Sequence, residues 1–167
     1  MDAATKNISL VSLDFAITQL GQREVPARSN KGPMVNEYLK SVGLKPGYAW
    51  CQAFVYWCVL QAARQLGLHC PAVRTAGVKD CWNRTPAERK ILIAAARANH
   101  ELVSPGDQVI LIFKDGAHTC FVERIEGEVI HTVEGNSNTN GSRDGELVCR
   151  HERHFSDPTI VGFIKYS

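Results

Sequence analysis

Cysteine and histidine are the side chains of this sequence that could together perform nucleophilic catalysis. A cysteine nucleophile needs a favoured thiolate, a base within reach, and a third group that orients the base. Cys51 follows Gly47 and Trp50 at the start of residues 48–63, which carry no charge, so we expect it in the first turn of a helix. Free amides and the positive dipole end at a helix start favour a thiolate. The amide of Cys51 could also hold a developing oxyanion.

A core role is the competing interpretation of Cys51. Residues 48–63 are apolar on every side of a helical wheel, a pattern typical of a helix in the middle of a domain. Buried cysteines usually act as small apolar side chains. Cys58 lies two turns further along the helix, where no free amides remain, so we interpret it as structural. This segment alone leaves both interpretations of Cys51 open.

The base should come from one of six histidines. Residues 118–125 and 129–133 flank a glycine-containing turn at residues 126–128, the pattern of a β-hairpin. His118 begins the first strand directly after a turn, where a side chain can be held rigidly at a cleft edge. His131 lies inside the second strand. Glu134 and Asn136 follow at the end of that strand and are the candidate orienting groups.

The register of this hairpin decides which histidine can work. His118 shares a face with Glu134 and Asn136 only if the numbers of paired residues sum to an even value, such as 252 or 254. A slip of one residue reverses the face of every side chain. The catalytic interpretation therefore requires an odd-length loop centred near Gly127, or a β-bulge. His131 then faces away from His118, which indicates a structural role.

The elements around these residues follow from hydrophobic periodicity and turn signals. We expect helices over residues 7–20, 33–39 and 48–63, short helical pieces within 70–105, a loop over 135–145, and strands over 109–113, 118–125, 129–133 and 160–166. Helices followed by antiparallel strands indicate an α+β fold. The length of 167 residues favours a single domain over residues 1–167.

Composition excludes several classes of protein. The net charge of +2 is spread along the chain, whereas nucleic-acid-binding proteins normally show a basic cluster. No apolar stretch reaches membrane-spanning length. The first residues lack the basic start, apolar stretch and cleavage site of a secretory signal. We therefore expect synthesis in the cytoplasm without a cleavable signal peptide.

The remaining cysteines and histidines give weaker signals. No pair of cysteines has the CxxC spacing of zinc ribbons or thioredoxin-like proteins. Cys70 and Cys81 flank a loop-like stretch and are the best candidates for a disulfide. Cys149, His151 and His154 form a string that could bind a metal, but its charged surroundings favour a solvated surface, so we predict no metal and no other cofactor.

Two segments resemble one known family. YAWCQAFVYWCV, residues 48–59, resembles the nucleophile helix of the CHAP family of cysteine, histidine-dependent amidohydrolases and peptidases. PGDQVILIFKDGAHTCFVERIEGEVIHTVEGNSN, residues 105–138, resembles that family's catalytic hairpin. The resemblance implies a papain-like α+β fold, in which N-terminal helices, including the nucleophile helix, pack on an antiparallel sheet.

The resemblance also implies the roles of individual residues. Cys51 would be the nucleophile and His118 the general base and later acid. Glu134 would orient the imidazole, with Asn136 as a further polar group at the site.

Three side chains are candidates for substrate binding. Tyr48 and Trp50 lie beside the nucleophile and could line a cleft, although aromatic residues there are more often core. Arg143 belongs to the polar, glycine-rich loop after the hairpin, which could cradle a substrate or be an ordinary connection.

The implied function is cleavage of an amide bond in bacterial peptidoglycan, by an amidase or a peptide-stem endopeptidase. A chain without a signal suits an antibacterial effector toxin injected by a secretion machine, or a phage-type lysin released on lysis. A toxin would be met by a cognate immunity protein. Two alternatives remain: a cytosolic amidase acting on a small amide conjugate, and an inactive wall-binding module.

Overall fold

Helices precede the main strands along the chain, as the sequence predicts. The computed structural model describes residues 7–137 and 145–167. The helices are α1 (Ile8–Thr18), α2 (Pro33–Ser41), α3 (Cys51–Leu66), α4 (Val78–Arg84) and α5 (Ile93–Ala98), with short 3₁₀ turns at Ala87–Arg89 and His100–Leu102. The strands are β1 (Lys90–Leu92), β2 (Gln108–Phe113), β3 (Gly116–Glu126), β4 (Val129–Ser137), β5 (Leu147–His154) and β6 (Ile160–Ile164).

Local chemistry fixes the ends of the first three helices. The Asn7 side chain accepts a hydrogen bond from the Leu10 amide and caps α1. Pro33 occupies the first turn of α2, where its missing N–H costs nothing and its fixed φ suits a helix. Gly67 ends α3 in the left-handed conformation, which glycine adopts without steric cost.

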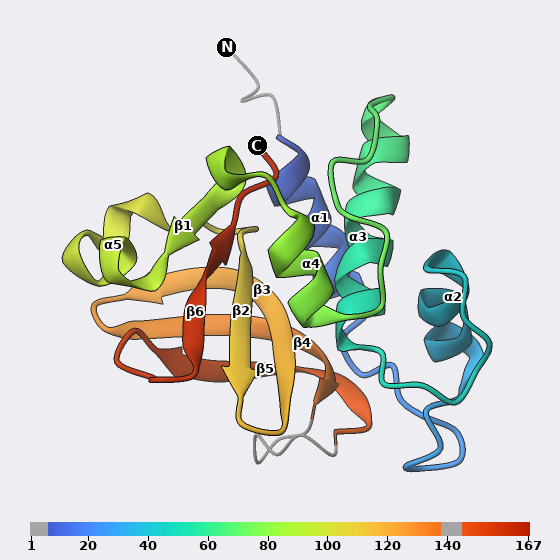
Figure 1. The fold of residues 1–167 in the computed structure, drawn as a ribbon. Coiled ribbons are helices and arrows are strands. Elements are labelled where there is room, and N and C mark those ends of the chain that lie inside the picture. Colours follow the sequence, from blue (N-terminus) through green and yellow to red (C-terminus); the bar gives the residue numbers. More distant parts are fainter. Residues whose placement is uncertain (1–6, 138–144) are drawn as a thin grey trace.

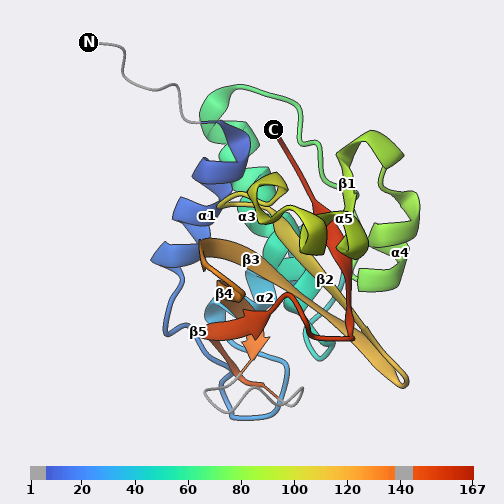
Figure 2. The same cartoon turned by 90° about the vertical axis from the view of Figure 1, so that its left-hand side faces the viewer.

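One six-stranded sheet, in the order β1-β6-β2-β3-β4-β5, joins only antiparallel neighbours. Helices α1 and α3 lie side by side in both views, with α5 at the far side of the sheet (Figure 1, Figure 2). The predicted α+β class is confirmed. Among the described residues, no helix is both long and apolar enough to cross a membrane.

The sheet carries apolar side chains on both faces. Ile110 of β2 packs in a cluster with residues of α1 to α4, whereas its neighbours Val109 and Leu111 pack in a second cluster that includes Ala96 of α5. This alternation is the period-2 pattern of a strand. It holds α3 firmly against one face of the sheet.

The β3–β4 hairpin meets the register requirement through a bulge. Near the turn, Glu126 pairs with Val129, an odd sum. The register shifts between Val122 and Arg124, and beyond that point Phe121 pairs with Val133, an even sum of 254. Because an extra residue in one strand reverses the facing of all that follows, His118 shares a face with Glu134.

The structure differs from the sequence prediction in three strands. Residues 147–154 form strand β5 and residues 90–92 form β1, neither of which the sequence predicted, and β4 continues to Ser137 where a loop was expected. The six cysteines are all free, so Cys70 and Cys81 form no disulfide. Strand β5 was missed because residues 150–154 are polar or charged on both faces of the strand, so the sequence shows no apolar face.

Gly135 is a point where the sheet and α3 touch closely. A Cβ atom there would lie 2.6 Å from Cγ of Phe54, a residue of α3 that is fully buried. We expect Gly135→Ala to lower the free energy of unfolding by about 1–3 kcal/mol, measured by denaturant titration. Adding Phe54→Leu should recover part of the loss, because the smaller side chain makes room. An unchanged midpoint in Gly135→Ala would contradict this packing.

Candidate active site

Cys51 is the first residue of α3, and Trp50 is the N-cap. The thiol is nearly buried, with 7% of the residue exposed. The amide of Cys51 lies in the first turn, where a helix offers no carbonyl partner. Cys58, two turns along, is completely buried, and burial raises the pKa of its thiol well above the ordinary value. Cys51 therefore lies at the start of α3 and Cys58 in its buried middle, the positions that the sequence predicts.

His118 lies between Cys51 and Glu134. Its Nε2 is 2.8 Å from Oε1 of Glu134, and the Cys51 thiol lies near the same ring. Burial acts to lower the pKa of His118, but the interactions with Cys51 and Glu134 outweigh it and raise the pKa to about 9. At neutral pH the ring is therefore an imidazolium.

The Glu134 carboxylate is completely buried and is surrounded by donors. Thr132 donates to Oε2 at 2.6 Å and Ser137 to Oε1 at 3.3 Å. Burial acts to raise the pKa of Glu134, but the hydrogen bonds from His118 and Arg153 outweigh it and hold the pKa well below its usual range. Glu134 is thus a charged group with fixed geometry.

Arg153 of β5 is a site residue that the sequence analysis missed. It forms a two-point ion pair with Glu134, with Nε 2.9 Å from Oε2 and Nη2 2.6 Å from Oε1. The sequence carries no alternation of apolar and polar residues here, because residues 150–154 are all polar or charged. The alternation appears only in the structure, where Arg150, Glu152 and His154 are exposed and Arg153 lies on the other face.

Asn136 lies on β4 two residues beyond Glu134, buried and with a left-handed backbone at φ 55°. Its Oδ1 is buried without a hydrogen-bond partner among the described residues. Glu134, and not Asn136, is the residue that contacts the His118 ring. The structure therefore places Asn136 near the chain of polar groups without joining it to them.

A pocket of about 440 Å³ opens over Cys51. The start of α3, the start of α4 and the β2–β3 hairpin meet there. Small or apolar residues supply most of its wall, among them Ala49, Ala76, Val78, Gly116 and Ala117. The thiol can therefore meet a carbonyl group that enters from solvent.

The three predicted substrate-binding residues have different outcomes. Trp50 does not line the cleft: it is fully buried, stacks on Tyr38, and donates its indole N–H to Glu24 at 2.9 Å. That prediction is wrong, because the ring is part of the core that anchors the start of α3. Tyr48 is 55% exposed three residues before Cys51, and its role stays a prediction. Arg143 lies outside the described residues.

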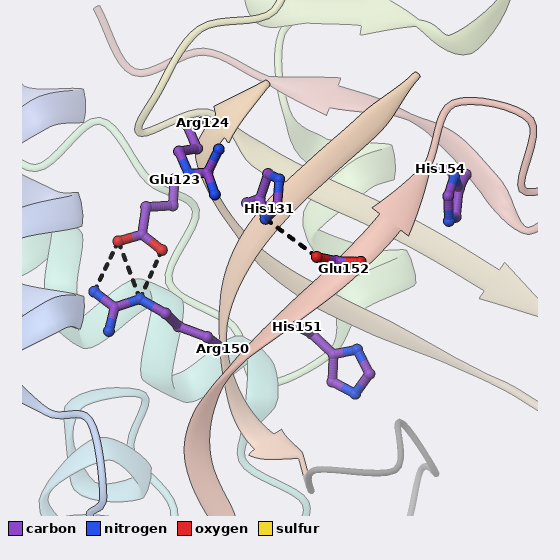
Figure 3. Close-up of a pocket in the computed structure, with 7 residues that line it drawn as sticks. All are labelled: Glu123, Arg124, His131, Arg150, His151, Glu152 and His154. Carbon is purple, nitrogen blue, oxygen red and sulfur yellow. Dashed lines mark hydrogen bonds and ion pairs between the residues drawn. The ribbon is translucent and has the colours of Figure 1, made fainter. Parts of the chain in front are cut away.

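A larger hollow of about 660 Å³, the outer hollow, is lined by residues of β3, β4 and β5 (Figure 3). His131 lines it between Glu126 and Glu152, at 3.5 and 3.7 Å, away from His118. His151 and His154 also line this hollow, whereas Cys149 is buried beside Glu134. Cys149, His151 and His154 therefore do not come together as metal ligands. The described residues contain no cluster able to hold a metal ion.

The arrangement has the parts that acyl transfer requires. A thiol at a helix start contacts an imidazole, and a buried carboxylate holds the far side of that ring. A cysteine sulfur and an imidazole placed in this way can attack a carbonyl carbon and then return a proton to the leaving group.

Comparisons with known proteins agree with this geometry. The sequence pattern described as CHAP domain matches residues 43–136. A solved structure titled "The crystal structure of Ly7917" aligns with 96% of this chain at a TM-score of 0.50 and 16% identity. This chain spans 62% of that chain's length, and at such identity the likeness shows the fold alone. No curated protein sequence matches this chain.

Proposed function

The chain belongs to the CHAP domain family, and from that premise we propose that it is a cysteine hydrolase that cleaves an amide bond in bacterial peptidoglycan. One observation carries the proposal. The Cys51 thiol at the start of α3, the His118 imidazole and the buried Glu134 carboxylate follow one another from a helix start into the core, with His118 Nε2 2.8 Å from Glu134.

In the first half of the proposed reaction the Cys51 thiolate attacks the amide carbonyl carbon. The carbonyl oxygen becomes an oxyanion, to which the free Cys51 amide can donate. The C–N bond then breaks as the His118 imidazolium gives its proton to the leaving amine. The products of this half are the free amine, a thioester on Cys51, and a neutral imidazole.

In the second half a water molecule replaces the amine. His118, now neutral, takes a proton from the water as it attacks the thioester carbonyl. The C–S bond breaks, the carboxylic acid leaves, and the thiolate–imidazolium pair is restored. His118 must therefore both release and recover a proton in every cycle, while Glu134 keeps its ring oriented.

The substrate sets where the protein must act. Peptidoglycan lies outside the cytoplasmic membrane, so an enzyme with this substrate has to reach the wall, by delivery through a secretion machine or by release on lysis. A role as an antibacterial effector toxin, with an immunity protein that covers the cleft over Cys51, belongs to the same proposal.

Digestion of purified peptidoglycan tests the function and identifies the bond. We expect wild-type protein to release soluble fragments whose masses show either new muramic-acid ends, for an amidase, or new peptide amino ends, for an endopeptidase. The matched control is Cys51→Ala under the same conditions. Hydrolysis of small amides without any action on peptidoglycan would instead support a cytosolic amidase. Identical product patterns from the two proteins would show that the fragments do not come from this site.

A further inference from the structure

The Glu134 carboxylate is held between two cations that come from different strands. His118 of β3 approaches Oε1 at 2.8 Å, and Arg153 of β5 reaches both oxygens. Glu134 itself is completely buried, and the Arg153 side chain is only 14% exposed. A two-point guanidinium–carboxylate pair in such surroundings is strong and fixed in orientation.

Arg150 of the same strand shows what an ordinary pair looks like. It binds Glu123 with two nitrogens, but its side chain is 56% exposed, and the pair lies in the outer hollow (Figure 3). Arg150 pairs with Val133 and Arg153 with Ile130 across the β4–β5 ladder, so the two arginines are on opposite faces. Only Arg153 points toward the catalytic carboxylate.

The cations that act on this carboxylate are His118 and Arg153, and Asp157 in turn acts on Arg153. Cys51 of α3 is the other group that acts on the His118 ring. Cys120 of β3 and Cys149 of β5 also face Glu134, and burial raises the pKa of both thiols, so they are neutral. Arg153 is therefore the permanent cation that balances Glu134 when His118 has given up its proton.

This balance matters because His118 has to become neutral during the reaction. A buried carboxylate without a cation is costly, so a Glu134 paired with His118 alone would hold the imidazolium proton tightly. The nearby guanidinium also repels the imidazolium charge. Both effects ease the release of the proton to the leaving amine.

We propose that Arg153 is a positioning residue, which neutralises Glu134 so that the carboxylate orients the His118 ring without trapping its proton. The inference rests on the proposed function, since that function requires His118 to cycle between its two protonation states. It adds a fourth member, from the strand after the catalytic hairpin, to the chain of groups that runs from Cys51.

Histidine-ring NMR titration of the intact protein tests this proposal without any substrate. Arg153→Gln removes the charge but keeps an N–H donor for Glu134. We expect the His118 midpoint to move up by about one pH unit or more, and the pH of fastest peptidoglycan hydrolysis to move up with it. Arg153→Lys keeps a cation beside Glu134, so its His118 midpoint should lie within a few tenths of a pH unit of the wild-type midpoint. Arg150→Gln is the matched control and should leave the midpoint unchanged.

The outcomes separate the two proposals. A His118 midpoint that stays in place or falls in folded Arg153→Gln overturns the role of Arg153, whatever the activity. Absence of hydrolysis by wild-type protein overturns the proposed function, but the His118 titration still tests the role of Arg153 because it needs no substrate. If Arg153→Gln does not fold, the double variant Arg153→Gln/Glu134→Gln carries no unpaired buried charge. The His118 midpoint should be higher in this double variant than in Glu134→Gln, because the guanidinium that repels the imidazolium is gone. An equal or lower His118 midpoint contradicts the proposal.

Discussion

Cys51→Ala is expected to lower kcat/KM for peptidoglycan by about 10⁴-fold or more. The substitution removes the sulfur that we propose forms the thioester, and the adjacent side chains offer no replacement: Gln52 is an amide and Ala49 and Ala53 are apolar. The thiol is small and lies at the edge of the core, so alanine should leave the fold intact. The rate is measured from the release of soluble fragments, and the fold from the unfolding midpoint.

Cys58→Ala is the matched control for this prediction. Cys58 is on the same helix, completely buried, and remote from the free amides of the first turn. We expect its loss to cost stability, as the removal of buried atoms does, while the hydrolysis rate of the folded protein stays near that of wild type. Comparable loss of activity in both variants would mean that Cys51 acts through packing and not as the nucleophile.

The parts of the site that could be predicted are those with local signals. Cys51 follows a glycine-containing turn and opens an uncharged helix, and these two features placed it at a helix start. His118 and Glu134 are separated by one hairpin, so a parity argument was enough to state which register would join them. The structure shows that register, through the bulge between Val122 and Arg124.

Contacts between residues far apart in the sequence could not be predicted in this way. Arg153 is 19 residues from Glu134 along the chain, on a strand whose exposed charges resemble a solvated loop. Trp50 was placed at the cleft because it precedes the nucleophile, but only the positions of Glu24 and Tyr38 show that its ring turns into the core. Pairwise contacts between distant segments decided both cases.

The same reasoning explains why β1 was missed. Lys90–Leu92 is a three-residue strand that pairs only with β6. So short a segment carries almost no periodicity, and its strand conformation depends on the partner that it meets in the folded chain. Its absence from the prediction did not affect the site, because β1 lies at the edge of the sheet opposite β5.

His118→Ala is expected to lower kcat/KM by on the order of 10³-fold. The variant loses the group that we propose protonates the leaving amine and activates the water, and it also loses the ring beside the Cys51 sulfur. His131→Ala is the matched control, since His131 lines the outer hollow on the same hairpin. A variant without His118 that keeps more than a tenth of the wild-type rate would exclude this histidine as the base.

The pH dependence of the wild-type enzyme should carry the signature of His118. Its pKa of about 9 in the folded protein lies above the ordinary value of about 6.5, so the imidazolium persists through neutral pH. Hydrolysis should therefore decline as the pH rises through about 9. The stability that the raised pKa contributes is fully present below about 6.5 and is lost as the pH rises through the folded pKa. The free energy of unfolding of wild type should consequently fall over that interval, and the fall should be smaller in His118→Ala. Equal slopes in the two proteins would mean that His118 is not protonated in the folded state.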